Sequence, residues 1–215
     1  MKTEVYVFSG LGADYRVFQN IELNDFNLNH ILWIPPLNDE SIAAYAKRLL
    51  SQIKTPNPVL IGLSFGGIMA VEVAKIIEVN KVILISSIKS KYEIPPYFRL
   101  AGKFKLHRLL PTKFLKTANF LSYWFFGIET KIDKQLLKQI LFDTNPQFLK
   151  WAINEIVMWK NEIILNNIYH IHGNNDHILP SLYIKPDVLI PRGGHFMILN
   201  KAVQIEAILN THLKQ

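Results

Sequence analysis

The chain has 215 residues, 49% of them hydrophobic, with no cysteine and a net charge of +7. This length favours one domain with a large core and argues against two independent domains. Without cysteine, a disulfide, a thiolate nucleophile and a cysteine-rich zinc site are all excluded.

Residues 1–4 lead into a β-like segment without the charged region and the long apolar stretch of a signal peptide. No later run approaches the roughly 20 apolar residues of a membrane span. We therefore expect a soluble, cytoplasmic protein.

Apolar runs typical of strands buried on both faces alternate along the chain with segments of helical spacing. The predicted strands lie at residues 5–8, 31–34, 58–61, 82–85, 168–173 and 187–190. The predicted helices lie at residues 14–20, 40–53, 65–78, 146–160 and 201–213. This alternation predicts a parallel sheet covered by helices, with a ligand crevice at the carboxyl ends of the strands. An aromatic, mainly helical stretch at 88–167 interrupts it, and we interpret this stretch as a cap inserted into a core of residues 1–87 and 168–215.

A Gly-x-Ser-x-Gly turn joins the third predicted strand to the helix that follows it. Gly62 and Gly66 are small enough for the strand and the helix to pass each other around a sharply turned Ser64. The hydroxyl of Ser64 then projects at the end of a parallel strand, and the amide of Phe65 lies at a helix N-terminus, where negative charge is favoured. Ser64 is therefore the predicted nucleophile. The alternative is a tight turn in which Ser64 only caps the helix.

A carboxylate and an imidazole, the groups that activate a serine hydroxyl, follow two later strands. Asp176 closes the turn after the strand at 168–173, and His195 follows Gly193-Gly194 after the last strand. A serine hydroxyl needs a base to take its proton, and the base needs a carboxylate to orient it. We assign these roles to His195 and Asp176, although each residue is also compatible with an ordinary turn or packing position. His177 adjoins the acid but ranks below His195, because sequence neighbours rarely point at each other.

The turn at residues 9–12 supplies the second predicted oxyanion donor. Gly10 leaves the backbone open to a substrate oxygen, and we choose the amide of Leu11 to join that of Phe65. A phosphate loop is the rival interpretation, but Gly10-x-Gly12 lacks a third glycine and the chain lacks Gly-x-x-x-x-Gly-Lys. Nucleotide binding is therefore disfavoured.

The turn at residues 62–66, the acid turn at 172–176 and the histidine loop at 193–197 together resemble the α/β-hydrolase superfamily. The resemblance spans nearly all of the chain outside the cap. It implies a serine hydrolase without a cofactor, a helical lid and an acyl-enzyme cycle. The two antiparallel strands that usually open this fold have no counterpart here, so we expect a mostly parallel sheet of about six strands. The oxyanion turn also reads Ser-Gly where many members have His-Gly.

The start of the cap is strongly basic. Its basic residues are Lys89, Lys91, Arg99, Lys103, Lys105, Arg108, Lys113 and Lys116, with Glu93 as the acidic neighbour. Aromatic and aliphatic residues are interleaved with them. An anionic membrane surface, an anionic substrate and a solvated face over a core-packed lid are all compatible with this pattern, and we favour the last. Nucleic acid is disfavoured, because no binding motif accompanies the charge.

From these residues we predict a carboxylic-ester hydrolase for a small or medium acyl substrate, with no metal. Its acyl pocket is expected in the cap, at Tyr123, Trp124, Phe125 and Phe126. Thioester hydrolysis or acyl transfer, and a small-molecule receptor with little turnover, remain open as alternatives.

Overall fold

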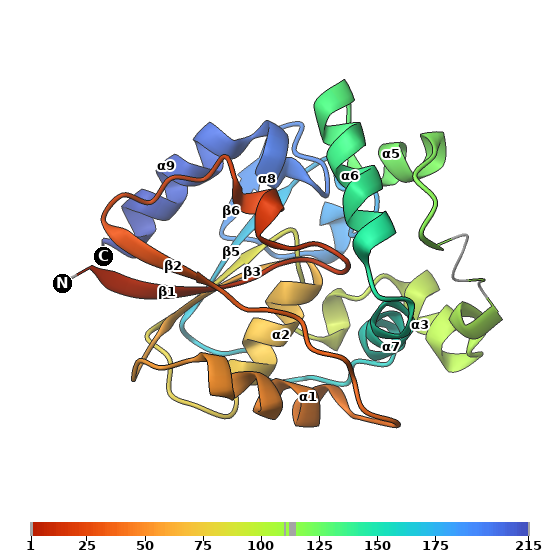
Figure 1. The fold of residues 1–215 in the computed structure, drawn as a ribbon, viewed down its shortest axis with the longest axis horizontal. Helices are drawn as coiled ribbons and strands as arrows, with labels where there is room; N and C mark the ends of the chain where they lie inside the picture. Colours follow the sequence, from red (N-terminus) through yellow and green to blue (C-terminus); the bar gives the residue numbers. More distant parts are fainter. Residues whose placement is uncertain (1, 110, 112–114, 215) are drawn as a thin grey trace.

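A computed structural model describes residues 2–109, 111 and 115–214 of the chain. Its six strands form one sheet in the order β2-β1-β3-β4-β5-β6, and every neighbouring pair is parallel (Figure 1). The strands are β1 (Thr3–Phe8), β2 (Phe26–His30), β3 (Val59–Leu63), β4 (Lys81–Ile85), β5 (Ile168–Gly173) and β6 (Val188–Ile190). The predicted parallel sheet of about six strands is confirmed.

The second strand was predicted at the wrong residues. Phe26–His30 pairs with β1, whereas residues 31–34 leave the sheet. Because β2 is an edge strand, it tolerates polar side chains, and the amides of Asn27 and Asn29 bind the Glu4 carboxylate at 2.7 and 2.6 Å. The apolar run that follows instead carries Trp33 into a cluster of aromatic rings beside the sheet.

Helices cover both faces of the sheet (Figure 1). Outside residues 88–167 they are α1 (Ile42–Leu49), α2 (Phe65–Ala74), α8 (Met197–Asn200) and α9 (Ala202–Leu213), with 3₁₀ turns at Tyr15–Phe18, Leu50–Gln52 and Ser181–Tyr183. The short helix predicted at 14–20 is thus a single 3₁₀ turn, and α2 ends four residues before the predicted boundary. The connection from β5 to β6 contains only the last 3₁₀ turn.

Residues 88–167 contain several short helices. Among the described residues they are α3 (Pro96–Lys103), α5 (Phe120–Phe126), α6 (Lys131–Asp143) and α7 (Pro146–Val157), with 3₁₀ turns at Lys91–Glu93 and Leu106–Leu109. In Figure 1 these helices stand at the carboxyl ends of the strands, on the side of the molecule away from the two termini. No helix in the described part of the chain combines the length and the apolar character needed to cross a bilayer.

The core forms one apolar cluster on each face of the sheet. Alternate residues of each strand point to opposite faces, so Leu60 belongs to one cluster and Ile61 to the other. Helix α2 is apolar on all sides, and its residues from Phe65 to Val73 are buried. This burial holds the start of α2 firmly against the end of β3.

A buried histidine in β5 makes stability depend on pH. Burial, together with the charges of His172 and Lys89, lowers the pKa of His170 well below its usual 6.5. Below pH 6.5 the unfolded chain therefore binds a proton that the folded chain does not, so stability falls as pH falls. Between pH 7.5 and 5.5 we expect the unfolding free energy of His170→Leu to fall by about 1.4 kcal/mol less than that of the unchanged protein. Urea unfolding at both pH values measures this, and an unchanged difference between them would contradict it.

Candidate active site

Ser64 lies in a strained turn between β3 and α2. Its backbone has φ 53° and ψ −120°, a conformation that L-residues rarely adopt and that costs on the order of 1–3 kcal/mol. A Cβ at Gly62 would lie 2.4 Å from the carbonyl oxygen of Gly66, and one at Gly66 would lie 2.1 Å from that of Phe8. The two glycines are therefore required for the helix to pass this close to the sheet. The Ser64 side chain makes no capping hydrogen bond to α2, which argues against the capping alternative.

Three side chains from separate loops form one chain of hydrogen bonds. Ser64 Oγ lies 2.8 Å from His195 Nε2, and His195 Nδ1 lies 2.8 Å from Asp176 Oδ2. Asp176 and His195 are 3% and 2% exposed, whereas Ser64 is half-buried and reachable from solvent. The loops after β3, β5 and β6 bring them together because parallel strands end at one edge of the sheet.

The Asp176 carboxylate is held in its charged form. Its Oδ1 accepts the amides of Ile178 and Leu179 at 2.9 and 2.8 Å, so it is a turn aspartate as well as a partner of His195. Burial alone would raise the pKa of Asp176, but the charges of His195 and His172 and these hydrogen bonds outweigh it and hold the pKa below 3.8. The group is ionised at neutral pH and can stabilise a positive charge on His195.

Sequence reasoning missed a second imidazole beside the acid. His172 lies wholly buried in β5, with Nε2 3.6 Å from Asp176 Oδ2 and 2.8 Å from the carbonyl oxygen of Leu179, to which it donates. Burial lowers the pKa of His172. Its position four residues before Asp176 was the available signal, but strand histidines are usually packing residues.

The turn at residues 10–12 lies against the serine. A Cβ at Gly10 would lie 3.5 Å from Ser64 Cβ, in ordinary contact. Leu11 is half-buried in this turn, and Phe65 is the first residue of α2, whose first amides have no partner within the helix. The structure thus brings both proposed oxyanion donors to the neighbourhood of Ser64.

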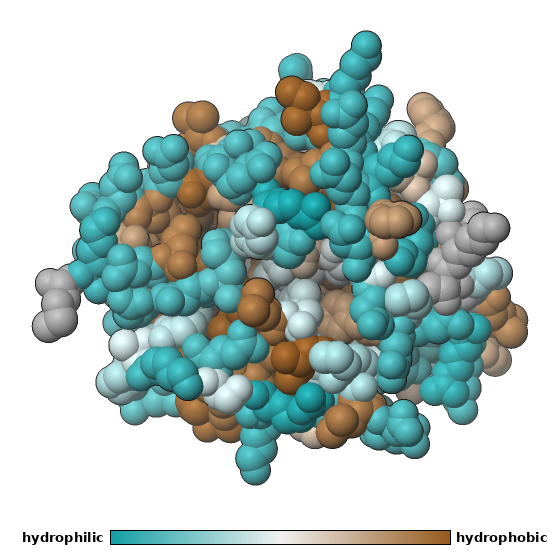
Figure 2. All heavy atoms as spheres, viewed as in Figure 1, coloured by the Kyte–Doolittle hydropathy of each residue, from teal (hydrophilic) through white to brown (hydrophobic). Residues whose placement is uncertain are grey.

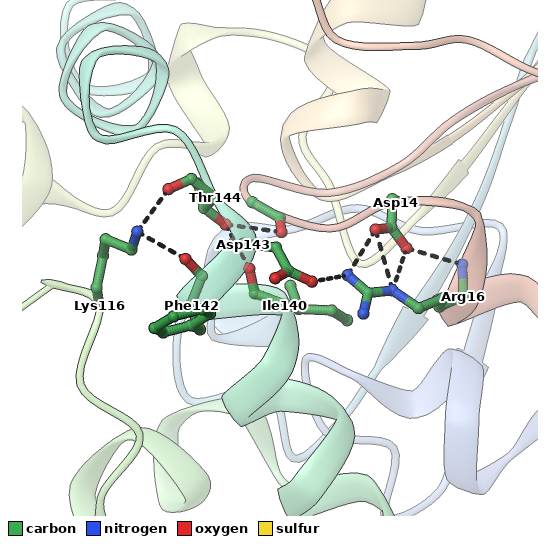
Figure 3. Close-up of polar contacts among 8 residues, drawn as sticks. Asp14, Arg16, Lys116, Ile140, Phe142, Asp143 and Thr144 are labelled. Atoms are coloured by element: carbon green, nitrogen blue, oxygen red, sulfur yellow. Dashed lines mark hydrogen bonds and ion pairs between the residues drawn. The ribbon is translucent and has the colours of Figure 1, made fainter.

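A polar network ties this turn to the end of α6 (Figure 3). Thr144 Oγ1 lies 2.9 Å from the carbonyl oxygen of Gly12 and 2.7 Å from that of Ile140, and its single hydroxyl hydrogen is shared between these two acceptors. Lys116 Nζ donates to the carbonyl oxygens of Phe142 and Thr144 at 2.8 and 2.7 Å.

Figure 3 shows a second connection between the same two segments. The guanidinium of Arg16 binds Asp14, near the turn, and Asp143, at the end of α6, at 2.7 and 2.8 Å. Sequence spacing gave no signal for the contacts of Arg16 with Asp143 and of Thr144 with Gly12, because each joins residues more than 120 positions apart.

The four aromatic residues predicted to line an acyl pocket separate in the structure. Phe126 meets the ring of His195 edge-on, with 5.9 Å between centroids. Trp124 stacks on His177 at 4.1 Å, and its carbonyl oxygen accepts a hydrogen bond from His177 Nδ1 at 2.9 Å. Trp124 and Phe125 are 48% and 38% exposed, and Tyr123 packs partly against the core and lies near Lys134. Phe126 thus lies beside His195 while Trp124 and Phe125 are exposed on α5, and the acyl pocket expected at these four residues stays a prediction.

A cavity of about 240 Å³ lies beside the turn at residues 9–12. Gly12 and Ala13 line it together with Trp33, Thr144 and Phe148. Trp33 packs against Phe65 and Phe148 with centroids 5.4 and 5.3 Å apart. Sequence reasoning missed this cavity, because its walls come from three distant segments and carry no motif.

No protein-family model and no curated protein sequence matches the chain. Solved structures do match it in shape. A thermophilic esterase from Thermogutta terrifontis, studied with malate bound, has a TM-score of 0.75 at 14% identity, over 100% of this chain and 90% of its own. An esterase from Exiguobacterium antarcticum has a TM-score of 0.70 at 16% identity, over 99% and 92%. A bromoperoxidase from Bacillus anthracis has a TM-score of 0.67 at 16% identity, over 100% and 93%. At such identities the likeness shows the fold alone.

Proposed function

Since the chain has the α/β-hydrolase fold, we propose that it is a serine hydrolase that cleaves carboxylic esters of small or medium acyl groups. The observation that carries the proposal is the pair of 2.8 Å contacts that join Ser64, His195 and Asp176. A hydroxyl, an imidazole and a buried carboxylate in this order are what acyl transfer to serine requires.

The reaction follows from this arrangement. His195 Nε2 takes the proton of Ser64 Oγ as that oxygen attacks the ester carbonyl carbon, and Asp176 stabilises the resulting imidazolium. The amides of Phe65 and Leu11 stabilise the oxyanion. Collapse of the intermediate expels the alcohol, which takes the proton from His195 and leaves an acyl group on Ser64. Water, deprotonated by His195, then releases the acid and restores the serine.

We propose that the acyl chain extends from Ser64 past Gly10 toward the 240 Å³ cavity lined by Gly12 and Phe148, rather than toward α5; Ser64 itself is not among the residues that line this cavity. At about 30 Å³ for each water-sized group, the cavity holds roughly eight non-hydrogen atoms. Butyrate esters should therefore fit, whereas palmitate esters should not. Widening this cavity at Trp33 or Phe148, which line it, would require these rings to move within the aromatic cluster.

A panel of p-nitrophenyl esters from acetate to palmitate, measured beside acyl thioesters of matched length, tests the proposal. We expect ester kcat/KM to peak at short chains and to exceed that for the matching thioester. Faster thioester cleavage would favour the thioesterase alternative. Slow labelling by a fluorophosphonate without turnover of any substrate would favour the low-turnover receptor.

We expect Thr144→Val to slow catalysis with little change in substrate binding, because valine keeps the shape of the side chain that lines the cavity. The variant keeps the shape of the side chain but loses the hydrogen bond to Gly12, so the oxyanion turn is less firmly placed. Loss of about 1 kcal/mol of transition-state stabilisation lowers kcat about fivefold at nearly constant KM. Thr144→Ser keeps the hydroxyl and should restore most of kcat. Equal losses in both variants at unchanged melting temperature would show that the hydrogen bond does not matter.

A further inference from the structure

One side of the molecule combines positive charge with exposed apolar side chains. Residues 94–128 contain six lysines and arginines and no aspartate or glutamate. The solvated face over a core-packed lid that we favoured for this segment is packed only in part, because many of its apolar side chains are exposed. Those with exposed side chains are Tyr97, Leu100, Phe104, Leu106, Leu109, Phe120, Leu121, Trp124 and Phe125. We call these residues, with Arg99, Lys103 and Lys105, the basic apolar surface.

The helices of this surface contribute very little to the core. Gly102 is the buried residue of α3, and α5 buries none of its residues. Phe104, Leu109 and Phe120 are 62, 78 and 84% exposed. Leaving side chains of this size in water is unfavourable, since burial of each stabilises by about 1.5–3 kcal/mol. Such a cluster in one segment indicates a surface that a partner covers.

The charged members of the surface are free to meet that partner. Among the described residues, no hydrogen bond or ion pair engages the side chains of Arg99, Lys103 or Lys105, and all three are exposed. Lys116 differs, because its ammonium binds the end of α6. The charge of the first three is therefore not used within the fold.

The helices of this surface lie on the same side of the molecule as the site. Figure 1 places α3 and α5 on the side of the molecule toward which the strands run, and away from both termini. In Figure 2, hydrophobic side chains reach the margin on this side near α3, next to hydrophilic ones. A body that contacts α3 and α5 together would thus lie in front of the edge of the sheet that carries Ser64.

We propose that the basic apolar surface docks the protein on an anionic lipid bilayer. Phosphate headgroups match its unpaired positive charge, and Trp, Tyr and Phe side chains are favoured at the boundary between headgroups and acyl chains. A flat bilayer contacts two separate helices at once, which a small anionic substrate does not. The docking is interfacial, and it would place the site close to lipid-derived esters.

Vesicle binding of the purified full chain tests the proposal. We expect binding to vesicles of phosphatidylserine and phosphatidylcholine, weak binding to phosphatidylcholine alone, and release by 0.5 M salt. Each basic residue near an anionic surface contributes about fivefold to affinity, so the triple variant Arg99→Gln, Lys103→Gln, Lys105→Gln should bind about 100-fold more weakly. Phe104→Ser, Leu109→Ser and Phe120→Ser combined should weaken binding at least about tenfold, because their side chains enter the interface.

Control variants remove equal numbers of positive charges and of exposed apolar side chains outside the basic apolar surface. One control replaces three exposed lysines by Gln, at Lys47, Lys160 and Lys185. The other replaces three exposed apolar residues by Ser, at Leu182, Val203 and Ile164. Both controls should bind vesicles as the unchanged protein does. The proposal fails if the unchanged protein ignores anionic vesicles, or if the controls lose as much binding as the surface variants. It also fails if the surface variants still bind vesicles and lose only the salt dependence of kcat/KM for a soluble anionic ester. That result would indicate that the positive charge steers substrate to the site. Vesicle binding does not require turnover, so this result stands apart from the proposed function.

Discussion

Ser64→Ala should abolish ester hydrolysis and labelling by a fluorophosphonate, with a loss of kcat on the order of 10⁴-fold or more. The variant lacks the oxygen that lies 2.8 Å from His195 Nε2, and no other hydroxyl is expected to replace it. Steady-state kinetics with a short p-nitrophenyl ester measures the loss. Covalent labelling followed by intact-mass spectrometry shows whether the serine is the modified residue.

The fold should survive this change. The Ser64 side chain makes no capping bond, and alanine must adopt the same strained backbone with φ 53°. We therefore expect a melting temperature within a few degrees of that of the unchanged protein. Persistent labelling of the alanine variant would show that another residue is the nucleophile. Ser64→Gly serves as a further control, because glycine relieves the strain and should stabilise the protein while remaining inactive.

His195→Ala is expected to be nearly as damaging as the loss of Ser64. Without the imidazole nothing takes the serine proton, and Asp176 is left as a buried carboxylate without its partner. Because the three residues act as a unit, the double variant with Ser64→Ala should be no slower than either single variant. Additive losses would mean that the two side chains act in separate steps.

His177→Ala should leave most of the activity, and it is the matched control for His195. The structure turns the His177 ring toward α5, where it stacks on Trp124 and binds the carbonyl oxygen of that residue. Its loss should lower the melting temperature slightly and change kcat less than about threefold, since no catalytic bond is broken. Equal damage from the two histidine variants, with both folded, would remove the basis for choosing His195.

The local sequence determined the sheet and the serine turn. Five of the six strands were predicted within a few residues, because strands buried on both faces are continuous apolar runs. Gly62 and Gly66 indicated the sharp turn at Ser64, since only a missing Cβ allows such close contact. The edge strand β2 was misplaced, because half of its surface faces solvent and its pattern is weaker.

Tertiary structure alone decided which side chains meet. The sequence proposed Asp176 and His195 from their places after strands, but only the folded chain brings them within 2.8 Å and sets His172 beside the acid. The tie from Thr144 to Gly12 and the cavity against Trp33 join segments that are far apart in sequence. Composition likewise could not tell a packed aromatic residue from the exposed Phe104, because burial depends on what the rest of the chain leaves uncovered.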